Sequence, residues 1–176
     1  MNEIIKKNGI TYGIILGVIS VLTTTLIYVI DLELFVNMWV GIIAIVINII
    51  VGVILVSKTK KQLNNVISFK EAFTVYFIAA ALGGLISIIF YYLLFNVIDP
   101  GAKATVQELT IKMTVGMMEK FGAPAESINT TVEELQKTDN YSLGSLVKGY
   151  FFGLIMNAVF GLILALIFKS KPAYKE

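Results

Sequence analysis

Side chains able to do chemistry are few in this sequence, and most lie outside its long apolar stretches. The 176 residues contain no Cys and no His, and all 14 basic residues are Lys. A thiolate nucleophile, a thiolate or imidazole metal site and an imidazole general base are therefore excluded, as is bidentate recognition of phosphate by Arg. The sequence predicts a protein that is not an enzyme, with no catalytic, cofactor-binding or metal-binding residue.

Two amides stand inside otherwise apolar stretches. Asn48 shares a helical face with Gly41 and Gly52, and Asn157 falls on a stripe of glycines spaced by four. We expect both amides to be buried, so each needs hydrogen-bond partners. An interhelical hydrogen bond worth about 1 kcal/mol is the interpretation we favour, and a polar track for a solute is the alternative. No Asp or Glu lies inside the four apolar stretches, which argues against a proton-coupled carrier.

Two charged sequence neighbours, Lys70 and Glu71, could bind a lipid headgroup or a partner. Ser68 and Glu71, however, fit the S-x-x-E capping box, in which each side chain satisfies a backbone N–H at a helix start. We therefore interpret Glu71 as part of a cap and Lys70 as a signal of membrane orientation.

The elements that position these residues are membrane spans. Hydrophobic residues make up 57% of the chain and charged residues 15%, with a mean hydropathy of +0.83. An ordinary soluble domain has about 25% charged residues. We predict an all-α fold, a single membrane domain over residues 1–176 that bundles four transmembrane helices. The predicted spans cover about residues 9–30, 38–56, 72–98 and 146–168.

The first stretch is a retained span in our interpretation, because it is longer than the apolar core of a signal peptide and lacks an A-x-A-like cleavage site. With four spans both termini lie on one side. That side carries nine Lys and three acids, and the opposite side five Lys and nine acids. The Lys-rich side stays cytoplasmic. The sequence therefore predicts a multi-pass membrane protein with both termini in the cytoplasm and residues 99–144 outside.

The predicted extracytoplasmic segment 99–144 contains two amphipathic helical patterns. The preceding span closes on Asp99-Pro100, where the residue before Pro is pushed out of the helical region. Thr105 and Glu108 fit a second capping box, which predicts a helix start there. An apolar face follows at helical spacing and comprises Val106, Leu109, Met113, Met117 and Phe121. This hairpin could bind a partner or cover the outer mouth of its own bundle, and we favour the cover.

The hairpin ends in a second pattern around Gly122, a plausible helix stop, and Pro124, which fits the start of the next helix. The apolar face of that helix comprises Ile128, Val132 and Leu135. The acids of the hairpin match no Ca²⁺-binding loop and are interpreted as a solvated face. They are Glu108, Glu119, Glu133 and Glu134.

Small residues form stripes in the first and fourth spans. Gly9, Gly13 and Gly17 are four apart, and so are Gly149, Gly153, Asn157 and Gly161. Such stripes let helix backbones approach closely. Packing inside one monomer is the interpretation we favour, and a homo-oligomer contact is the alternative.

These features together resemble a known family. The SFKEAF entry from Ser68 to Phe73, the Asp99-Pro100 exit and the turn from Gly122 to Glu126 are similar to those of the bacterial domain-of-unknown-function family 4199, over roughly residues 5–170. The resemblance implies a small integral protein of the bacterial inner membrane, extracytoplasmic at residues 99–144, and no particular activity.

The function expected is a non-enzymatic membrane module that binds a membrane or periplasmic protein partner, or lipid, through its external hairpin. The alternative is a small pore or carrier that uses the Asn48/Asn157 face. The lipid bilayer is the surrounding partner in either case. A net charge of +2 gives no reason to expect nucleic acid.

Overall fold

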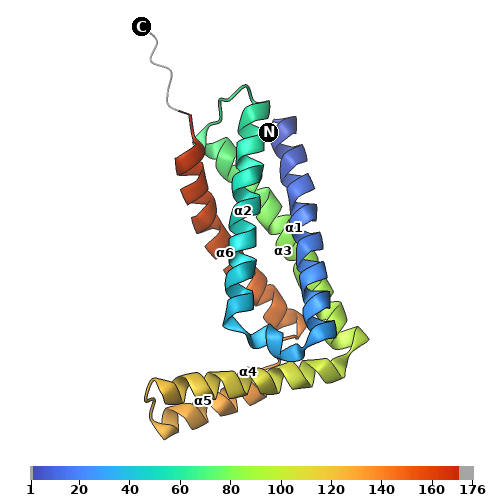
Figure 1. Ribbon diagram of the computed structural model, residues 1–176, viewed down its shortest axis with the longest axis vertical. Coiled ribbons are helices and arrows are strands. Elements are labelled where there is room, and N and C mark those ends of the chain that lie inside the picture. Colours follow the sequence, from blue (N-terminus) through green and yellow to red (C-terminus); the bar gives the residue numbers. More distant parts are fainter. Residues whose placement is uncertain (1, 171–176) are drawn as a thin grey trace.

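The computed structural model describes residues 2–170, and this part of the chain consists of helices joined by short loops, with no strand (Figure 1). Its α-helices are α1 (Glu3–Ile30), α2 (Met38–Gln62), α3 (Phe69–Leu93), α4 (Pro100–Lys120), α5 (Ala125–Lys137) and α6 (Leu143–Phe168). A 3₁₀ turn, η1 (Leu32–Val36), joins α1 to α2, and a π turn, η2 (Leu94–Ile98), ends α3. The predicted all-α fold is confirmed.

Four of these helices are long and apolar enough to cross a membrane, namely α1, α2, α3 with η2, and α6. The protein is therefore a membrane protein. In Figure 1 the four helices stand side by side, with the start of α1 and the end of α6 at one end and the α4–α5 hairpin across the other. We call these the terminal end and the hairpin end.

Each span begins or ends with local signals. Ser68 and Glu71 form the predicted capping box at the start of α3, with the Glu71 N–H donating to Ser68 Oγ over 3.2 Å and the Ser68 N–H to Glu71 Oε2 over 2.9 Å. Helices α1 and α2 extend beyond the apolar stretches, since α1 starts at Glu3 and α2 reaches Gln62. Both helices therefore include polar turns that lie outside the spans predicted from hydropathy.

The start of α4 differs from its prediction. The helix begins at Pro100, and Asp99 caps it by accepting the Ala102 N–H over 2.9 Å. Thr105 lies in the second turn, and its hydroxyl donates to the Gly101 carbonyl. The pattern at Thr105 was wrong as a helix start because Asp99, six residues earlier, is a cap followed by Pro, whose backbone is pre-set for the first turn.

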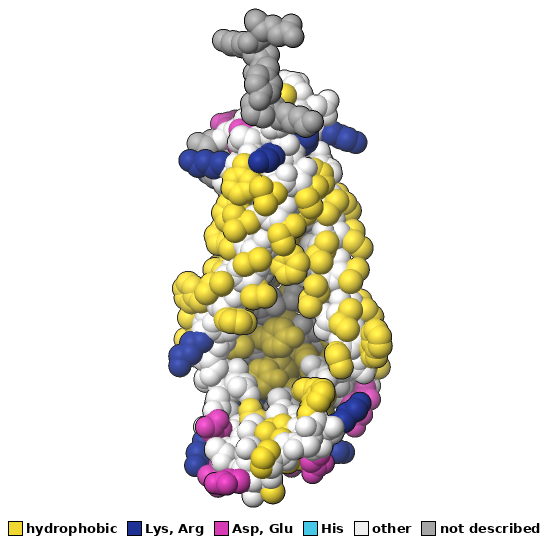
Figure 2. Space-filling view, turned by 90° about the vertical axis from the view of Figure 1, so that its left-hand side faces the viewer, with side chains coloured by type: hydrophobic (Ala, Val, Ile, Leu, Met, Phe, Trp, Pro, Cys, Tyr) yellow, Lys and Arg dark blue, Asp and Glu magenta, His cyan; other side chains and the backbone are white. Residues whose placement is uncertain are grey.

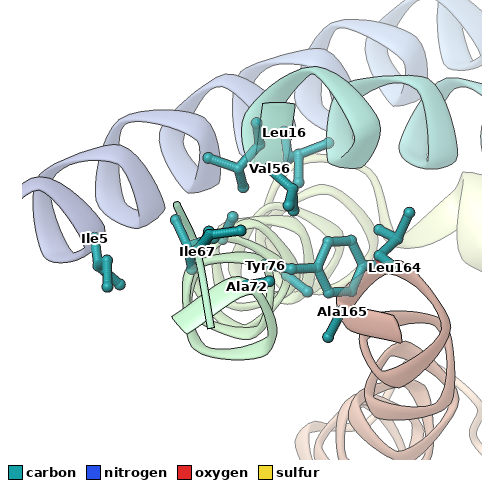
Figure 3. Packing of buried hydrophobic residues seen from close by; sticks show 12 residues of the cluster. Ile5, Leu16, Val56, Ile67, Ala72, Tyr76, Leu164 and Ala165 are labelled. Atoms are coloured by element: carbon teal, nitrogen blue, oxygen red, sulfur yellow. The ribbon is translucent and has the colours of Figure 1, made fainter. Parts of the chain in front are cut away.

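The main apolar core lies in the terminal half of the bundle and draws on all four spans (Figure 3). Leu55, Val56 and Ala165 are completely buried there, and Tyr76 almost so. The stripe of Gly9, Gly13 and Gly17 continues this contact along α1 and α3. An added Cβ at each of the three would lie 2.6–2.8 Å from a side chain of α3. The intramolecular interpretation of this stripe is confirmed.

A second, smaller apolar cluster lies at the hairpin end. It consists of Leu94 and Phe95 of η2 with Ala102 and Val106 of α4. Aromatic rings surround it, and Phe95 lies 4.3 Å from Tyr141 between ring centroids and 5.4 Å from Phe35. The first two turns of α4 are therefore fixed to the base of the bundle.

Candidate functional site

The hairpin half of the bundle contains a cavity with two lobes. One lobe, of about 380 Å³, lies between α1, α2 and α3, and the other, of about 340 Å³, lies between α3 and α6. Both volumes fall in the range of about 300–1,000 Å³ typical of ligand pockets. The two lobes share five lining residues, which are Ala80, Gly84, Ser87, Tyr91 and Asn157.

The cavity exists because α2 and α6 meet only near the terminal end. Gly52 of α2 lies against Tyr76 and Leu164, and an added Cβ there would come within 2.8 Å of the Tyr76 ring. Toward the hairpin end, a Cβ added at Gly41 of α2, or at Gly149 or Gly153 of α6, would meet no atom within 4 Å. The two helices therefore leave unfilled space between their hairpin halves.

This cavity is open on the side of the bundle. Figure 2 shows a recess directly above the hairpin arm, with apolar side chains on its floor and an apolar belt around it. The outward faces of α2 and α6 are exposed and apolar over the same turns. They carry Ile42, Ile45, Val46, Phe152, Ile155 and Met156. An opening among such side chains faces lipid tails when the four helices cross a bilayer.

Toward the terminal end the core closes the cavity. Leu55, Val56 and Ala165 are fully buried and fill the space among the four spans there. The cavity thus extends through only part of the bundle.

Asn157 lies where the two lobes meet, and its polar atoms are satisfied. The Tyr76 hydroxyl of α3 donates to Asn157 Oδ1 over 2.9 Å, and Asn157 Nδ2 donates to the Gly153 carbonyl over 2.9 Å. A second interhelical pair links Ser20 Oγ of α1 to Ser87 Oγ of α3 at 2.8 Å. The favoured interpretation of Asn157 as an interhelical hydrogen-bonding residue is confirmed.

Asn48 was expected to behave like Asn157, and this expectation is wrong in part. The Asn48 side chain is exposed on the first lobe, and Asn48 Nδ2 donates to the Ala44 carbonyl of its own helix over 2.8 Å. Among residues 2–170, no donor is bonded to Asn48 Oδ1. The two predicted amides do line one lobe, but only Asn157 joins two helices.

The chain matches a known protein family over most of its length. The family described as "Protein of unknown function (DUF4199)" matches residues 11–170. The chain belongs to the DUF4199 family. This match confirms the resemblance carried by the span entry and exit motifs. Neither the comparison with curated proteins nor that with solved structures found a match.

A polar network fixes the hairpin of this DUF4199 chain below the cavity. Asp99 accepts the Tyr28 hydroxyl of α1 over 2.9 Å as well as the Ala102 N–H, and these two bonds hold the pKa of its carboxyl below the usual range. Lys103 pairs with Asp139 and also donates to Asn96 Oδ1 over 3.2 Å. The hairpin is therefore tied to α1 and η2 by side chains as well as by its capped first turn.

The chain segment after α5 belongs to the same network. Burial raises the pKa of the Asp139 carboxyl, but hydrogen bonds from Lys103 and from the Tyr141 and Ser142 backbone outweigh it and leave that pKa low. Burial, with a smaller contribution from Tyr91, raises the pKa of Tyr141 to about 12. Asn96 Nδ2 donates to the Tyr141 carbonyl over 2.8 Å, which joins η2 to the start of α6.

The other residues that the sequence singled out do not gather at the cavity of the DUF4199 chain. Lys70 is exposed at the terminal end beside the capping box. Gly161 packs against Tyr76 and Phe73, whereas Gly149 and Gly153 line the second lobe. The intramolecular interpretation of the α6 stripe thus holds at Asn157 and Gly161 and not at Gly149 and Gly153.

Two features of the hairpin end of α6 were missed by sequence reasoning. Lys148 lies inside the fourth span, in the second turn of α6, and its side chain is exposed. Asn140 and Ser145 line the hairpin end of the second lobe and place polar groups at its edge. The position of Lys148 within residues 146–168 was the signal that could have drawn attention to this end of α6.

Proposed function

We propose that this DUF4199 protein is a non-enzymatic membrane module that binds the apolar chain of a lipid in the cavity between α2 and α6. The observation that carries the proposal is the lateral opening of a cavity in the hairpin half of the bundle (Figure 2). A lipid tail is the apolar molecule present beside that opening at the highest concentration. Among the polar groups on the walls, Ser20 and Ser87 are bonded to each other, and Asn157 is bonded to Tyr76 and to the Gly153 carbonyl.

The walls suit an elongated apolar ligand with one polar end. Ala80 and Gly84 of α3 and Gly149 and Gly153 of α6 line the second lobe together with larger apolar side chains such as Leu146 and Leu154. Polar groups stand at its hairpin end, at Asn140 and Ser145. A polar headgroup at that end and a tail directed toward Asn157 would match this distribution.

A photocrosslinking experiment tests the proposal. The full-length protein is placed in nanodiscs with a phospholipid that carries a photoreactive group on its tail, and crosslinked peptides are mapped by mass spectrometry. We expect Gly153→Phe, which fills the second lobe, to reduce crosslinks to cavity-lining peptides several-fold. Gly144→Phe is the matched control, because Gly144 also lies on α6 with no atom within 4 Å of an added Cβ but does not line the cavity.

Equal crosslinking of wild type and Gly153→Phe at the lining peptides would contradict lipid binding. The alternative occupant of the cavity is another copy of the chain, and disulfide formation would detect it. Since the chain has no Cys, a single Gly153→Cys variant that forms a disulfide between two copies would show that the cavity is an oligomer contact instead.

A solute pathway along Asn48 and Asn157 is the second candidate, because both side chains line the first lobe. The buried core of the terminal half lies across any such pathway, which weighs against a static pore. Liposome flux is the test. We expect liposomes that contain the wild-type protein to stay tight. Flux that stops in Asn48→Leu/Asn157→Leu would favour the pathway.

The orientation we propose places both termini in the cytoplasm of a bacterial cell and the α4–α5 hairpin outside. The uneven distribution of Lys between the two ends supports it. Reporter fusions after Asn65 and after Thr138 should report inside and outside, respectively. The reverse result would overturn the orientation and leave the cavity proposal untouched.

A further inference from the structure

The α4–α5 hairpin extends past the bundle as an arm. In Figure 1, α4 crosses the hairpin end of the spans at a steep angle and continues beyond them, with α5 alongside. Only its first turns are buried against the bundle, where Ala102 and Val106 are 4% and 1% exposed. The outer part of α4 therefore makes no buried contact with the bundle.

The buried face of α4 continues as an apolar stripe along the exposed part. At 3.6 residues per turn, Ala102, Val106, Met113 and Met117 fall within about 40° of one line on the helix. Met113 is 37% exposed and Met117 is 45% exposed, and Phe121 at the end of the helix reaches 84%. The same face therefore covers the bundle near Val106 and has no protein partner, among the described residues, near Phe121.

The other faces of α4 have different surroundings. Helix α5 covers one of them, where the Gln107 side chain donates to the Leu135 and Thr138 carbonyls. Glu108, Lys112 and Glu119 are exposed and lie about 120–160° from the apolar stripe. One face of α4 thus packs on α5 and another is charged. The apolar stripe is on the side of α4 that faces the bundle.

The level at which the arm leaves the bundle coincides with the expected membrane boundary. The spans end at the hairpin end in large apolar side chains that are 60–72% exposed, among them Val29, Ile30, Trp39, Val97 and Ile98. These need an apolar or interfacial environment, and Trp is typical of the membrane–water interface. Helix α4 starts two residues after Ile98, so its apolar stripe faces the headgroup region of the bilayer.

We propose that the α4–α5 arm lies along the membrane surface, with Met113, Met117 and Phe121 inserted among the lipid headgroups. Surface helices that present an exposed apolar stripe lie in this plane with that stripe buried about 5–10 Å. The occupant of the exposed stripe is therefore lipid, and the stripe continues an interface that α4 already makes with the spans. This inference is independent of the cavity proposal.

The charge of the arm sets a further expectation. Between Asp99 and Asp139 the chain carries seven acids and four Lys, so anionic lipids do not attract it. Insertion should depend on the apolar stripe alone. We expect it to be the same in nanodiscs of phosphatidylcholine and in nanodiscs that also contain phosphatidylglycerol.

Single-cysteine labelling tests the arm directly, because the wild-type chain offers no competing thiol. An environment-sensitive fluorophore is attached to Met117→Cys or to Glu119→Cys in the full-length protein in nanodiscs. Brominated lipid tails should quench the label at 117 several-fold more than the label at 119, and aqueous iodide should show the reverse preference. Residue 119 is the matched control on the charged face of the same turn.

Equal exposure of both labels to iodide would overturn the proposal and leave the arm in water. Protection at 117 without quenching by brominated lipid, accompanied by crosslinks to another polypeptide, would overturn it in favour of a protein partner. Both positions are already at the surface, so the labels do not disturb the fold. Phe121→Cys repeats the measurement at the most exposed position of the stripe.

Discussion

Two stripes of small residues with the same spacing have opposite surroundings in this molecule. In α1, a Cβ added at Gly13 would lie 2.8 Å from the Leu82 side chain of α3. In α6, a Cβ added at Gly149 or Gly153 would meet no atom within 4 Å. One stripe closes the bundle and the other leaves it open.

The residues opposite each stripe account for this difference. The α1 glycines face Ile78, Leu82 and Ile86, large side chains that are themselves spaced by four on α3. Gly149 and Gly153 have no such residue opposite them, and the ring that reaches Gly84 of α3 from α6 belongs to their neighbour Tyr150. Large side chains that fit onto the α1 glycines give close packing, whereas space remains beside Gly149 and Gly153 because no side chain reaches them. A glycine stripe in a membrane helix thus predicts packing only together with its partner.

The largest expected effect comes from filling the closed stripe. Gly13→Leu places a branched side chain where even a Cβ is too close to Leu82 and the Ala79 carbonyl. Overpacking of this kind costs about 1–3 kcal/mol, and we expect a clear loss of thermal stability in detergent. Gly153→Leu is the matched control and should unfold near the wild-type temperature. Equal destabilisation of the two variants would contradict the proposed difference in packing between the α1 and α6 stripes.

Acidification should act on the hairpin half alone. Because the folded-state pKa values of Asp99 and Asp139 are lowered, their contribution to stability is complete above about pH 4, near the ordinary Asp pKa, and is lost as the pH falls through the folded values. Amide exchange in the first turns of α4 should accelerate in that window, while amides around Gly13 keep their protection.

Asp99→Asn is the control for that acid effect. Asn still caps a helix N-terminus but does not titrate, so α4 in this variant should lose most of the part of its pH dependence that comes from residue 99. Acceleration that is unchanged in Asp99→Asn would show that another group controls the attachment of the arm.

The interhelical hydrogen bond at the junction of the two halves should have a smaller effect. Tyr76→Phe removes the hydroxyl that donates to Asn157 Oδ1, and such bonds in membrane proteins average about 0.6 kcal/mol. Asn48→Leu removes no interhelical bond and should change the free energy of unfolding by less. Chemical denaturation in mixed micelles measures both. A larger cost for Asn48→Leu would mean that Asn48 has a partner that the monomer lacks.

Local signals in the sequence predicted much of the fold. The capping box at Ser68 and Glu71 is present. Gly122 ends α4 with a φ of +71° and a Schellman-type pair of bonds, in which the Gly122 N–H donates to Glu119 and the Ala123 N–H to Met118. These features depend on a few neighbouring residues. Sequence reasoning could reach them for that reason.

The candidate site was less predictable, because it depends on distant residues. Asn48 and Asn157 look alike in sequence, and only the position of Tyr76 on another helix separates them. The π turn at Leu94–Ile98 and the course of the arm follow from packing of Phe95 and Val106 at the base of the bundle. The spacing of residues along one helix does not show which residues of a neighbouring helix pack against them.

Gly→Ala substitutions should have the smallest effects on stability. They test most directly whether the two stripes differ in packing, because the expected sign of the stability change differs between them. Ala is a better helix former than Gly by up to about 1 kcal/mol. At Gly153 an added methyl meets nothing, so Gly153→Ala should raise stability by a few tenths of a kcal/mol. At Gly17 the methyl would lie 2.6 Å from Ile86, and Gly17→Ala should lower it. If both substitutions stabilise the protein, α3 yields easily and the α1 stripe is not a tight contact. If both destabilise it, the space beside α6 is filled in the membrane, which is the outcome that a bound lipid tail would produce.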